Sequence, residues 1–308
     1  YMKGELKIAA AEPEKKIRPA KPSADSLIAD VASVYPGESQ AIVTEGVKRL
    51  VDYQNPAYAQ LYLDRLAGVL AIDRERGGER NNWALTVEAG RYLALMMSYE
   101  DIIRVADLKS RRSRMNRVRT EVMAKANEPV YVTEFLKPGF DEFTSVMPPW
   151  LGRPVMNWAN GNDWAKNYNF AMRVRSHTIF GFLRMWLLSK LRFYRPGTYR
   201  YSQEQTAIEG WLEVVIEAAS RHYRLAVEIA ELANLRKGYS DTHKRGLANF
   251  RRVMDEIAIP CAKGEKDPAW GADAVAKLRA AALADPEGDA LDKAMAALST
   301  TPKAEAAE

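Results

Sequence analysis

Apolar residues recur along most of this chain every three or four positions, which is the spacing of helices that bury one face. From Ser39 to Gln54, for example, the apolar stripe consists of Ile42, Val43, Val47, Leu50 and Val51. Helices are predicted over residues 23–35, 39–54, 55–70, 86–108, 202–237, 246–257, 271–284 and 288–299. The pattern indicates a mainly α-helical protein.

Local signals mark the ends of some of these helices. Asn55 followed by Pro56 is typical of a helix cap and first helical position, and Ser202 with Gln205 has the spacing of a capping box. The helix expected after Ser202 continues to Lys237, which is about 50 Å at about 1.5 Å per residue. Such a helix would span a whole domain.

Between residues 127 and 168 the helical pattern stops. The segment holds Pro129, Pro138, Pro148, Pro149, Pro154, Trp150, Trp158 and Trp164. Pro129–Thr133 is its one convincing strand-like run, and a lone strand pair is only marginally stable. We therefore expect a multi-helix bundle with an irregular Pro/Trp-rich insertion and little or no strand.

The chain is expected to divide into three parts. Residues 1–22 combine three prolines with charges of both signs and are interpreted as an N-terminal remnant and linker. Residues 23–260 form the helical domain, and residues 261–308 form an alanine-rich tail with short helices. Because the chain begins with tyrosine, we interpret it as a piece of a longer polypeptide.

The composition of the chain limits which catalytic, metal and cofactor sites it can hold. With 308 residues, 47% of them hydrophobic, the chain can bury a real core. Its single cysteine, Cys261, cannot hold an iron–sulfur cluster or close an internal disulfide, and it favours a reducing compartment. The sequence lacks the glycine signatures of dinucleotide and phosphate loops and the His-Glu-x-x-His zinc motif. We therefore predict no catalytic residue, metal ligand or cofactor within this chain.

Neither a secretory signal nor a membrane span is indicated. The strongest apolar stretch, Ile179 to Leu191, is interrupted by Arg184 and Lys190. It is also shorter than a membrane-spanning helix, which needs about 20 residues. We expect a cytoplasmic protein without a membrane partner.

Basic residues gather in two places, although the net charge is only +5. No carboxylate occurs between Asp163 and Glu204, a stretch that contains Lys166, Arg173, Arg175, Arg184, Lys190, Arg192, Arg195 and Arg200. The second set comprises Arg104, Lys109, Arg111, Arg112, Arg114, Arg117 and Arg119. Most such runs are solvated faces. The alternative is a face, including Arg173, Arg175 and His177, that binds an acidic or phosphate-bearing partner.

Nucleic acid is another candidate partner for the basic residues. The sequence pI of about 9.1 and the interleaved Tyr194, Tyr199 and Tyr201 fit such a module. No helix-turn-helix or other recognisable module accompanies them, so nucleic acid is not the favoured partner.

One short turn, Lys237 to Gly246, crowds polar, titratable and glycine residues together. Gly238 suits the left-handed residue that ends a helix, and Ser240 or Asp241 can accept from the free amides of the next helix. His243 would lie in the first turn of that helix. Two interpretations stay open: a plain helix hairpin, or a turn that presents Tyr239, Asp241, Thr242 and His243 to a partner or ligand.

This turn is also one of three motifs that carry a family resemblance. The others are Leu50–Ala59 and Tyr99–Lys109. Together they resemble the carboxy-terminal region of the beta subunit of indolepyruvate oxidoreductases, over Ile42 to Ile257. The family's turn usually reads Gly-Tyr-Gly-Asp-Thr-His, so Ser240 departs from it.

The resemblance implies a role inside a larger enzyme. Members of that family decarboxylate arylpyruvates with thiamine diphosphate, pass electrons through iron–sulfur clusters to ferredoxin, and yield an acyl-coenzyme A. Their thiamine and cluster sites lie on other domains or subunits. We expect a helical extension that supports assembly or docks a partner: the catalytic domain or subunit, with ferredoxin or coenzyme A as candidates for the basic face.

Within the second motif, Tyr99, Glu100, Asp101 and Arg104 are candidate partner-facing residues. Glu100 and Arg104 are one helical turn apart and would form an ion pair. If this patch meets the Asp241-Thr242-His243 turn in space, the two would make a buried network. A regulatory binding module, a nucleic-acid binder and an enzyme whose site the spacing does not reveal remain alternatives.

Overall fold

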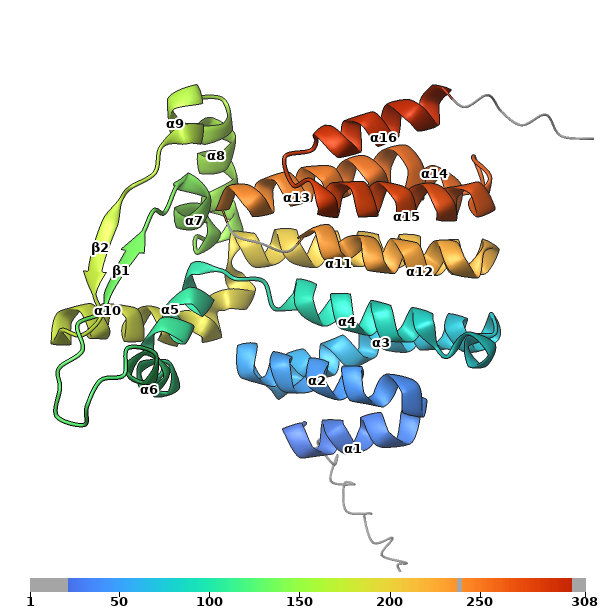
Figure 1. The fold of residues 1–308 in the computed structure, drawn as a ribbon. Helices are drawn as coiled ribbons and strands as arrows, with labels where there is room; N and C mark the ends of the chain where they lie inside the picture. Colours follow the sequence, from blue (N-terminus) through green and yellow to red (C-terminus); the bar gives the residue numbers. More distant parts are fainter. Residues whose placement is uncertain (1–21, 237–239, 301–308) are drawn as a thin grey trace, which may run out of the picture.

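Helices dominate the computed structural model, which describes residues 22–236 and 240–300 and shows a mainly α-helical protein. The bundle consists of α1 (Ala24–Val34), α2 (Gly37–Tyr53), α3 (Pro56–Glu75), α4 (Ala84–Met97), α11 (Tyr199–Arg221), α12 (Tyr223–Leu232), α13 (Ser240–Val253), α14 (Ile259–Ala262), α15 (Pro268–Ala284) and α16 (Asp289–Thr300). Short turns of 3-10 helix follow α3 (η1, Gly78–Asn81) and α12 (η3, Ala233–Arg236). In Figure 1 the layers stack from α1 at the bottom to α16 at the top.

A single hydrophobic core runs through these layers, from Leu27 in α1 to Met295 in α16. Near its centre the Trp211 side chain is almost fully buried, and its indole N–H donates to the Ile229 carbonyl over 3.2 Å. Residues 261–300, expected as an alanine-rich tail, supply α15 and α16 to this same core, because the α15 residues Val275 and Leu278 are buried in it.

The segment between α4 and α11 leaves the bundle as an arm, defined here as residues 102–197. It contains α5 (Ile102–Ser110), α6 (Arg112–Glu121), β1 (Thr133–Leu136), α7 (Phe140–Ser145), α8 (Pro149–Asn160), α9 (Asp163–Asn167), β2 (Met172–Arg175), α10 (Ile179–Lys190) and η2 (Leu191–Gly197). The arm projects to one side, with α8 and α9 at one end of the β1–β2 ribbon and α5, α6 and α10 at the other (Figure 1). Its own cluster of buried apolar residues is small and consists of Ala106, Val174 and Met185.

The two strands pair antiparallel, with Glu134 opposite Val174. The strand predicted over residues 129–133 therefore lies a few residues too early, since β1 begins at Thr133. The buried Glu134 carboxylate explains the position, because it forms ion pairs with Lys109 of α5 and, over 2.5 Å, with Arg114 of α6. These ion pairs with α5 and α6 fix where β1 begins, and strand propensity alone does not reveal such a tertiary contact.

Several helix ends follow the local signals. The Asn55 side chain accepts from the Tyr58 amide over 2.9 Å at the start of α3, as the Asn-Pro pair predicts. The capping box expected at Ser202 is wrong, because α11 begins at Tyr199 and the Thr198 hydroxyl accepts from the Tyr201 amide instead. The single helix predicted over residues 86–108 is likewise interrupted between α4 and α5.

Two helix ends differ from the prediction. The long helix expected to reach Lys237 breaks at His222, whose ring Nδ1 accepts from the Leu225 amide and so caps α12. Pro260 was expected to end a helix, yet the helix continues to Ala262. A π-helical turn, η4 (Met254–Ala258), precedes the proline, and the Glu256 carbonyl accepts from the Lys266 ammonium over 2.8 Å.

A buried carboxylate closes the end of the bundle opposite the arm. Asp73 accepts from the Thr86 amide and hydroxyl over 2.9 and 2.6 Å, and from the Tyr223 hydroxyl over 2.9 Å. The intervening loop passes through Asn82 and Trp83, both with left-handed backbone at φ 52° and 54°. Because Asp73 has three donors, its burial is compensated and the loop is held in place.

Among the described residues, none of the helices combines the length and the apolar character that crossing a bilayer requires.

Candidate functional site

Two of the candidate motifs meet where the arm joins the bundle. Asp101 lies between α4 and α5, and its carboxylate caps α5 by accepting from the Arg104 amide over 2.6 Å. The same carboxylate receives two hydrogen bonds from the Arg195 guanidinium, of 2.6 Å to Oδ2 and 3.2 Å to Oδ1. Arg195 belongs to η2, so this pair joins the two ends of the arm.

Arg195 is 1% exposed, and its remaining contacts come from the end of α2. The guanidinium donates to the Tyr53 carbonyl over 3.0 Å and to the Gln54 side-chain oxygen over 2.6 Å. It also lies over the Tyr53 ring, 4.1 Å from the ring centre. A buried arginine with four hydrogen bonds and a stacking ring is fully compensated, so it acts as a structural lock.

Tyrosines surround this lock. The rings of Tyr53 and Tyr99 are 5.9 Å apart, and Tyr58 lies 6.0 Å from Tyr53. Burial, followed by the nearby Asp101 charge, raises the pKa of Tyr53 and of Tyr99. These phenols therefore keep their protons at neutral pH and do not serve as bases.

Arg104 has partners other than the one predicted. Glu100 is exposed and precedes the first residue of α5, so the one-turn helical geometry with Arg104 does not exist. Arg104 instead pairs with Asp52 over 2.9 Å and with Asp107 over 3.0 Å. Arg111 contacts the same two carboxylates.

Asp52 feels opposing effects on its protonation. Partial burial acts to raise its pKa, but hydrogen bonds from Arg111 and Arg104 outweigh burial and leave the pKa below its ordinary value. The Asp52 carboxylate therefore stays charged and fixes the start of the arm to α2.

Arg173, Arg175 and His177 lie elsewhere, on and just after β2. Arg173 and Arg175 point away from the arm's small core, because Val174 between them is buried in it. The Arg173 guanidinium lies over the exposed Phe135 ring, 5.4 Å from its centre. His177 contacts the residue just before β1, since its Nδ1 is 3.1 Å from the Val132 nitrogen and 2.9 Å from the Val132 oxygen. The structure therefore separates these three residues from the Asp101 junction.

Part of the third motif, including Tyr239, lies outside the described residues. Helix α13 begins at Ser240, so His243 lies in its first turn as predicted, and Thr242 is exposed. The side chains of Asp241 and His243 also lie outside what the structure describes. Contact between this turn and the Asp101 junction stays a prediction.

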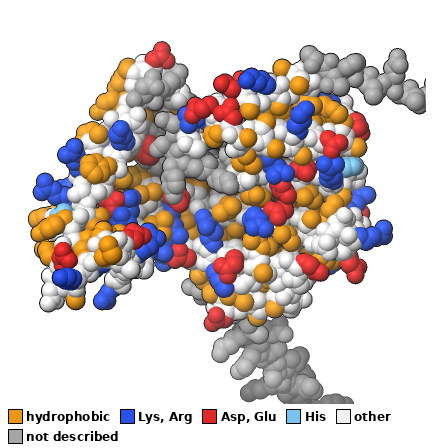
Figure 2. Space-filling model, viewed as in Figure 1, with side chains coloured by type: hydrophobic (Ala, Val, Ile, Leu, Met, Phe, Trp, Pro, Cys, Tyr) orange, Lys and Arg blue, Asp and Glu red, His pale blue; other side chains and the backbone are white. Residues whose placement is uncertain are grey.

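The arm carries an exposed apolar surface that the sequence pattern did not single out. Among the described residues, the exposed large hydrophobic side chains lie between Val122 and Tyr194, except for Val34, Leu95 and Leu283. The most exposed include Ile179 and Phe180 in α10 and Trp150 in α8, at 75–83%. Figure 2 shows hydrophobic side chains interspersed with Lys and Arg along the arm, at the left of the view.

Near α9 the exposed aromatics contact one another. The Phe140 ring lies 5.8 to 6.1 Å from the rings of Trp158, Trp164 and Tyr168, mostly edge to face. The two tryptophans are themselves 5.8 Å apart and at least half exposed. Such rigid aromatic groups are typical anchors of protein interfaces.

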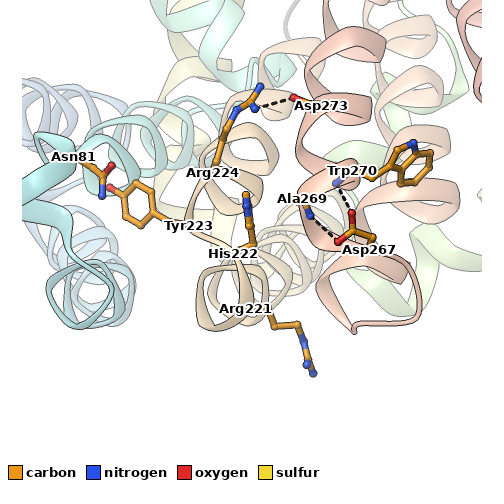
Figure 3. A pocket seen from close by; sticks show the side chains of 9 residues that line it. All are labelled: Asn81, Arg221, His222, Tyr223, Arg224, Asp267, Ala269, Trp270 and Asp273. Atoms are coloured by element: carbon orange, nitrogen blue, oxygen red, sulfur yellow. Dashed lines mark hydrogen bonds and ion pairs between the residues drawn. The ribbon is translucent and has the colours of Figure 1, made fainter. Parts of the chain in front are cut away.

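An open groove of about 730 Å³ lies at the other end of the bundle, between α12 and α15 (Figure 3). Its charged groups are engaged with each other or with the backbone. Arg224 pairs with Asp273 over 2.7 Å, and Asp267 accepts from the first amides of α15. Arg221 points away from the other side chains in Figure 3 and donates to the Ala262 carbonyl. The groove therefore presents no concentrated charge to a ligand.

Comparison with known proteins places the chain in a family. Residues 39–256 match the model of a family of unknown function, DUF6537. The chain belongs to this family. Neither the curated proteins nor the solved structures contain a significant match. The matched residues include the whole arm and the Asp101–Arg195 junction, so both are features of the family region.

Proposed function

We propose that this chain is the helical extension of an indolepyruvate oxidoreductase-like enzyme and that its arm docks the catalytic domain or subunit. The exposed apolar surface of the arm carries the proposal. Folded proteins that act alone rarely expose a large contiguous apolar patch, and an exposed patch rimmed by polar residues is typical of an interaction surface. The bundle has only three large hydrophobic side chains of comparable exposure among its described residues.

The junction supports the same role. Arg195 ties both ends of the arm to α2 through Asp101, Tyr53 and Gln54. A surface held in one orientation loses less conformational entropy on binding than a mobile one. Two of the three motifs that carry the resemblance, Leu50–Ala59 and Tyr99–Lys109, supply the partners of Arg195 in this junction.

In this proposal the chain itself catalyses no chemical step. Thiamine diphosphate and the iron–sulfur clusters belong to the partner, which decarboxylates an arylpyruvate to an acyl-coenzyme A with ferredoxin as acceptor. Ferredoxin or coenzyme A remain candidates for the basic residues of the arm, including Arg173 and Arg175. The assembly would work in the cytoplasm.

Paired substitutions in the whole enzyme test the role of the arm. Leu183 and Leu187 of α10 are 42% and 53% exposed, while Leu95 and Leu283 of the bundle are 39% and 41% exposed. We expect Leu183→Ser with Leu187→Ser to release the catalytic polypeptide or domain and to lower indolepyruvate-dependent acceptor reduction about tenfold or more. Leu95→Ser with Leu283→Ser is the matched control and should leave both unchanged. Equal behaviour of the two pairs would refute docking through the arm.

A further inference from the structure

Helix α10 has two apolar faces, of which the arm covers only one. Gly181, Met185 and Ser189 are buried, in the direction of α5 and β2. On the opposite side Ile179, Leu183, Trp186 and Leu187 are exposed at positions i, i+4, i+7 and i+8. That spacing is typical of a helix face that packs against another surface. From Ile179 to Leu187 the outer face of α10 therefore has the form of a contact surface about 12 Å long, at about 1.5 Å per residue.

The charges beside this face have no counterions within the described chain. Arg184, Lys190 and Arg192 are exposed, and none of them forms an ion pair with a carboxylate of residues 22–236 or 240–300. The Lys190 ammonium lies 4.9 Å from the centre of the Trp186 ring, so charge and apolar surface are adjacent.

The second basic set differs. Arg104 and Arg111 pair with Asp52 and Asp107, and Lys109 and Arg114 pair with Glu134. Carboxylates of α2 and of the arm thus pair with these four cations, while Arg184, Lys190 and Arg192 remain available to a partner.

A second copy of this chain is a poor occupant of the face. In a two-fold symmetric contact the same patch meets itself, so Arg184, Lys190 and Arg192 would approach the same cations of the other copy. A membrane surface fits less well than a folded partner, because exposed aromatic residues belong both to α8 and α9 and to α10 and η2. These elements lie at opposite ends of the β1–β2 ribbon (Figure 1).

We propose that the outer face of α10 binds an apolar surface edged with carboxylates on the catalytic partner. This inference rests on the proposed docking function and adds the chemistry of the partner's surface. Apolar contact with Leu183 and Trp186 would hold the two together, while pairing with Arg184, Lys190 and Arg192 would select the partner and speed encounter. Binding should therefore weaken as salt rises, more than apolar contact alone would give.

Charge reversal tests this inference. The variant Arg184→Glu with Arg192→Glu is made in the full chain, and its binding to the rest of the enzyme is measured at about 50 mM and about 300 mM salt. At low salt we expect the variant to bind at least about tenfold more weakly than the unchanged chain. Raising the salt should weaken the variant's binding little further. Arg74→Glu with Arg80→Glu, two exposed cations of the bundle, is the matched control and should bind normally.

The outcomes separate the two proposals. If charge reversal leaves binding unchanged while Leu183→Ser with Leu187→Ser abolishes it, the arm docks without acidic pairing and the present inference is overturned. If neither pair matters, the proposed function fails as well. Vesicles of phosphatidylserine and phosphatidylcholine, and single-stranded DNA, serve as competing probes. Loss of vesicle or DNA binding on charge reversal, with enzyme assembly unchanged, would also overturn the inference.

Discussion

Helices α4 and α10 are both rich in large apolar residues, yet they lie in opposite surroundings. In the bundle, α4 packs against α2, α3 and α12 and buries Leu85, Leu93, Met96 and Met97. In the arm, α10 buries mainly small side chains and Met185, and leaves its outer leucines and Trp186 exposed. The comparison teaches that an apolar helix need not indicate a core. In the arm it forms an exposed surface, which we propose that a partner covers.

The largest expected effect contrasts a tryptophan from each region. Trp211→Ala should lower the free energy of unfolding by about 3–5 kcal/mol, because it empties a large buried site and removes the bond to the Ile229 carbonyl. Trp186→Ala should change it by less than about 0.5 kcal/mol in the isolated chain, since Trp186 is 40% exposed. Urea unfolding followed by circular dichroism measures both. Similar losses would erase the distinction between bundle and arm.

The junction between the two regions should come next. Arg195→Met leaves the buried Asp101 carboxylate without its main counterion, and we expect a loss of about 3 kcal/mol. Arg192→Met, at an exposed position three residues earlier, should change stability by less than about 0.5 kcal/mol. Thermal unfolding of the two variants gives the comparison, and equal melting temperatures would contradict the structural lock.

Cysteine reactivity offers a third contrast, which depends on pH. Burial raises the pKa of Cys261 from its ordinary value of 9.0 to about 11, so the folded bundle holds the protonated thiol. In a Leu187→Cys variant, iodoacetamide at pH 8 should modify the arm thiol about a hundredfold faster than Cys261, since the thiolate is the reactive form. Peptide mass spectrometry reads both sites. Equal labelling of the two thiols would count against burial of Cys261.

The same burial predicts how stability depends on pH. Because the folded state binds the Cys261 proton more tightly, the free energy of unfolding should fall as pH rises through the range from 9.0 to about 11.

A smaller effect is expected from single hydroxyl groups. Tyr223→Phe removes one of the donors to the buried Asp73 carboxylate and should lower stability by about 1–2 kcal/mol. Tyr194→Phe, in the exposed part of η2, should be neutral to within about 0.5 kcal/mol. Chemical denaturation again decides, and a neutral Tyr223→Phe would mean that Asp73 does not need its third donor.

Much of the bundle could be predicted because its signals are local. The stripe from Ile42 to Val51 and the Asn55-Pro56 start lie within one or two turns of the helices they specify. The break at His222 and the continuation of the helix past Pro260 could not be predicted, since an imidazole cap and a π-helical turn depend on where neighbouring groups lie. The start of β1 is likewise set by ion pairs between Glu134 and another part of the arm.

The candidate site shows the same limit. Asp101 was predicted as a candidate, but Arg195, its partner, is 94 residues away and appeared only as one of a run of cations. The apolar stretch of α10 was visible in the sequence. Which of its two faces stays exposed depends on how Val174 and Ala106 pack, and no periodicity contains that information.

The most direct measurement is hydroxyl-radical footprinting of α10 and η2 in the isolated 308-residue chain and in the assembled enzyme. Trp186 and Phe193 should be oxidised readily in the isolated chain, where they are 40% and 77% exposed, and strongly protected in the assembly. Leu283 of the bundle, 41% exposed, should be oxidised equally in both. Equal oxidation of Trp186 and Phe193 in the two samples would contradict docking through the arm.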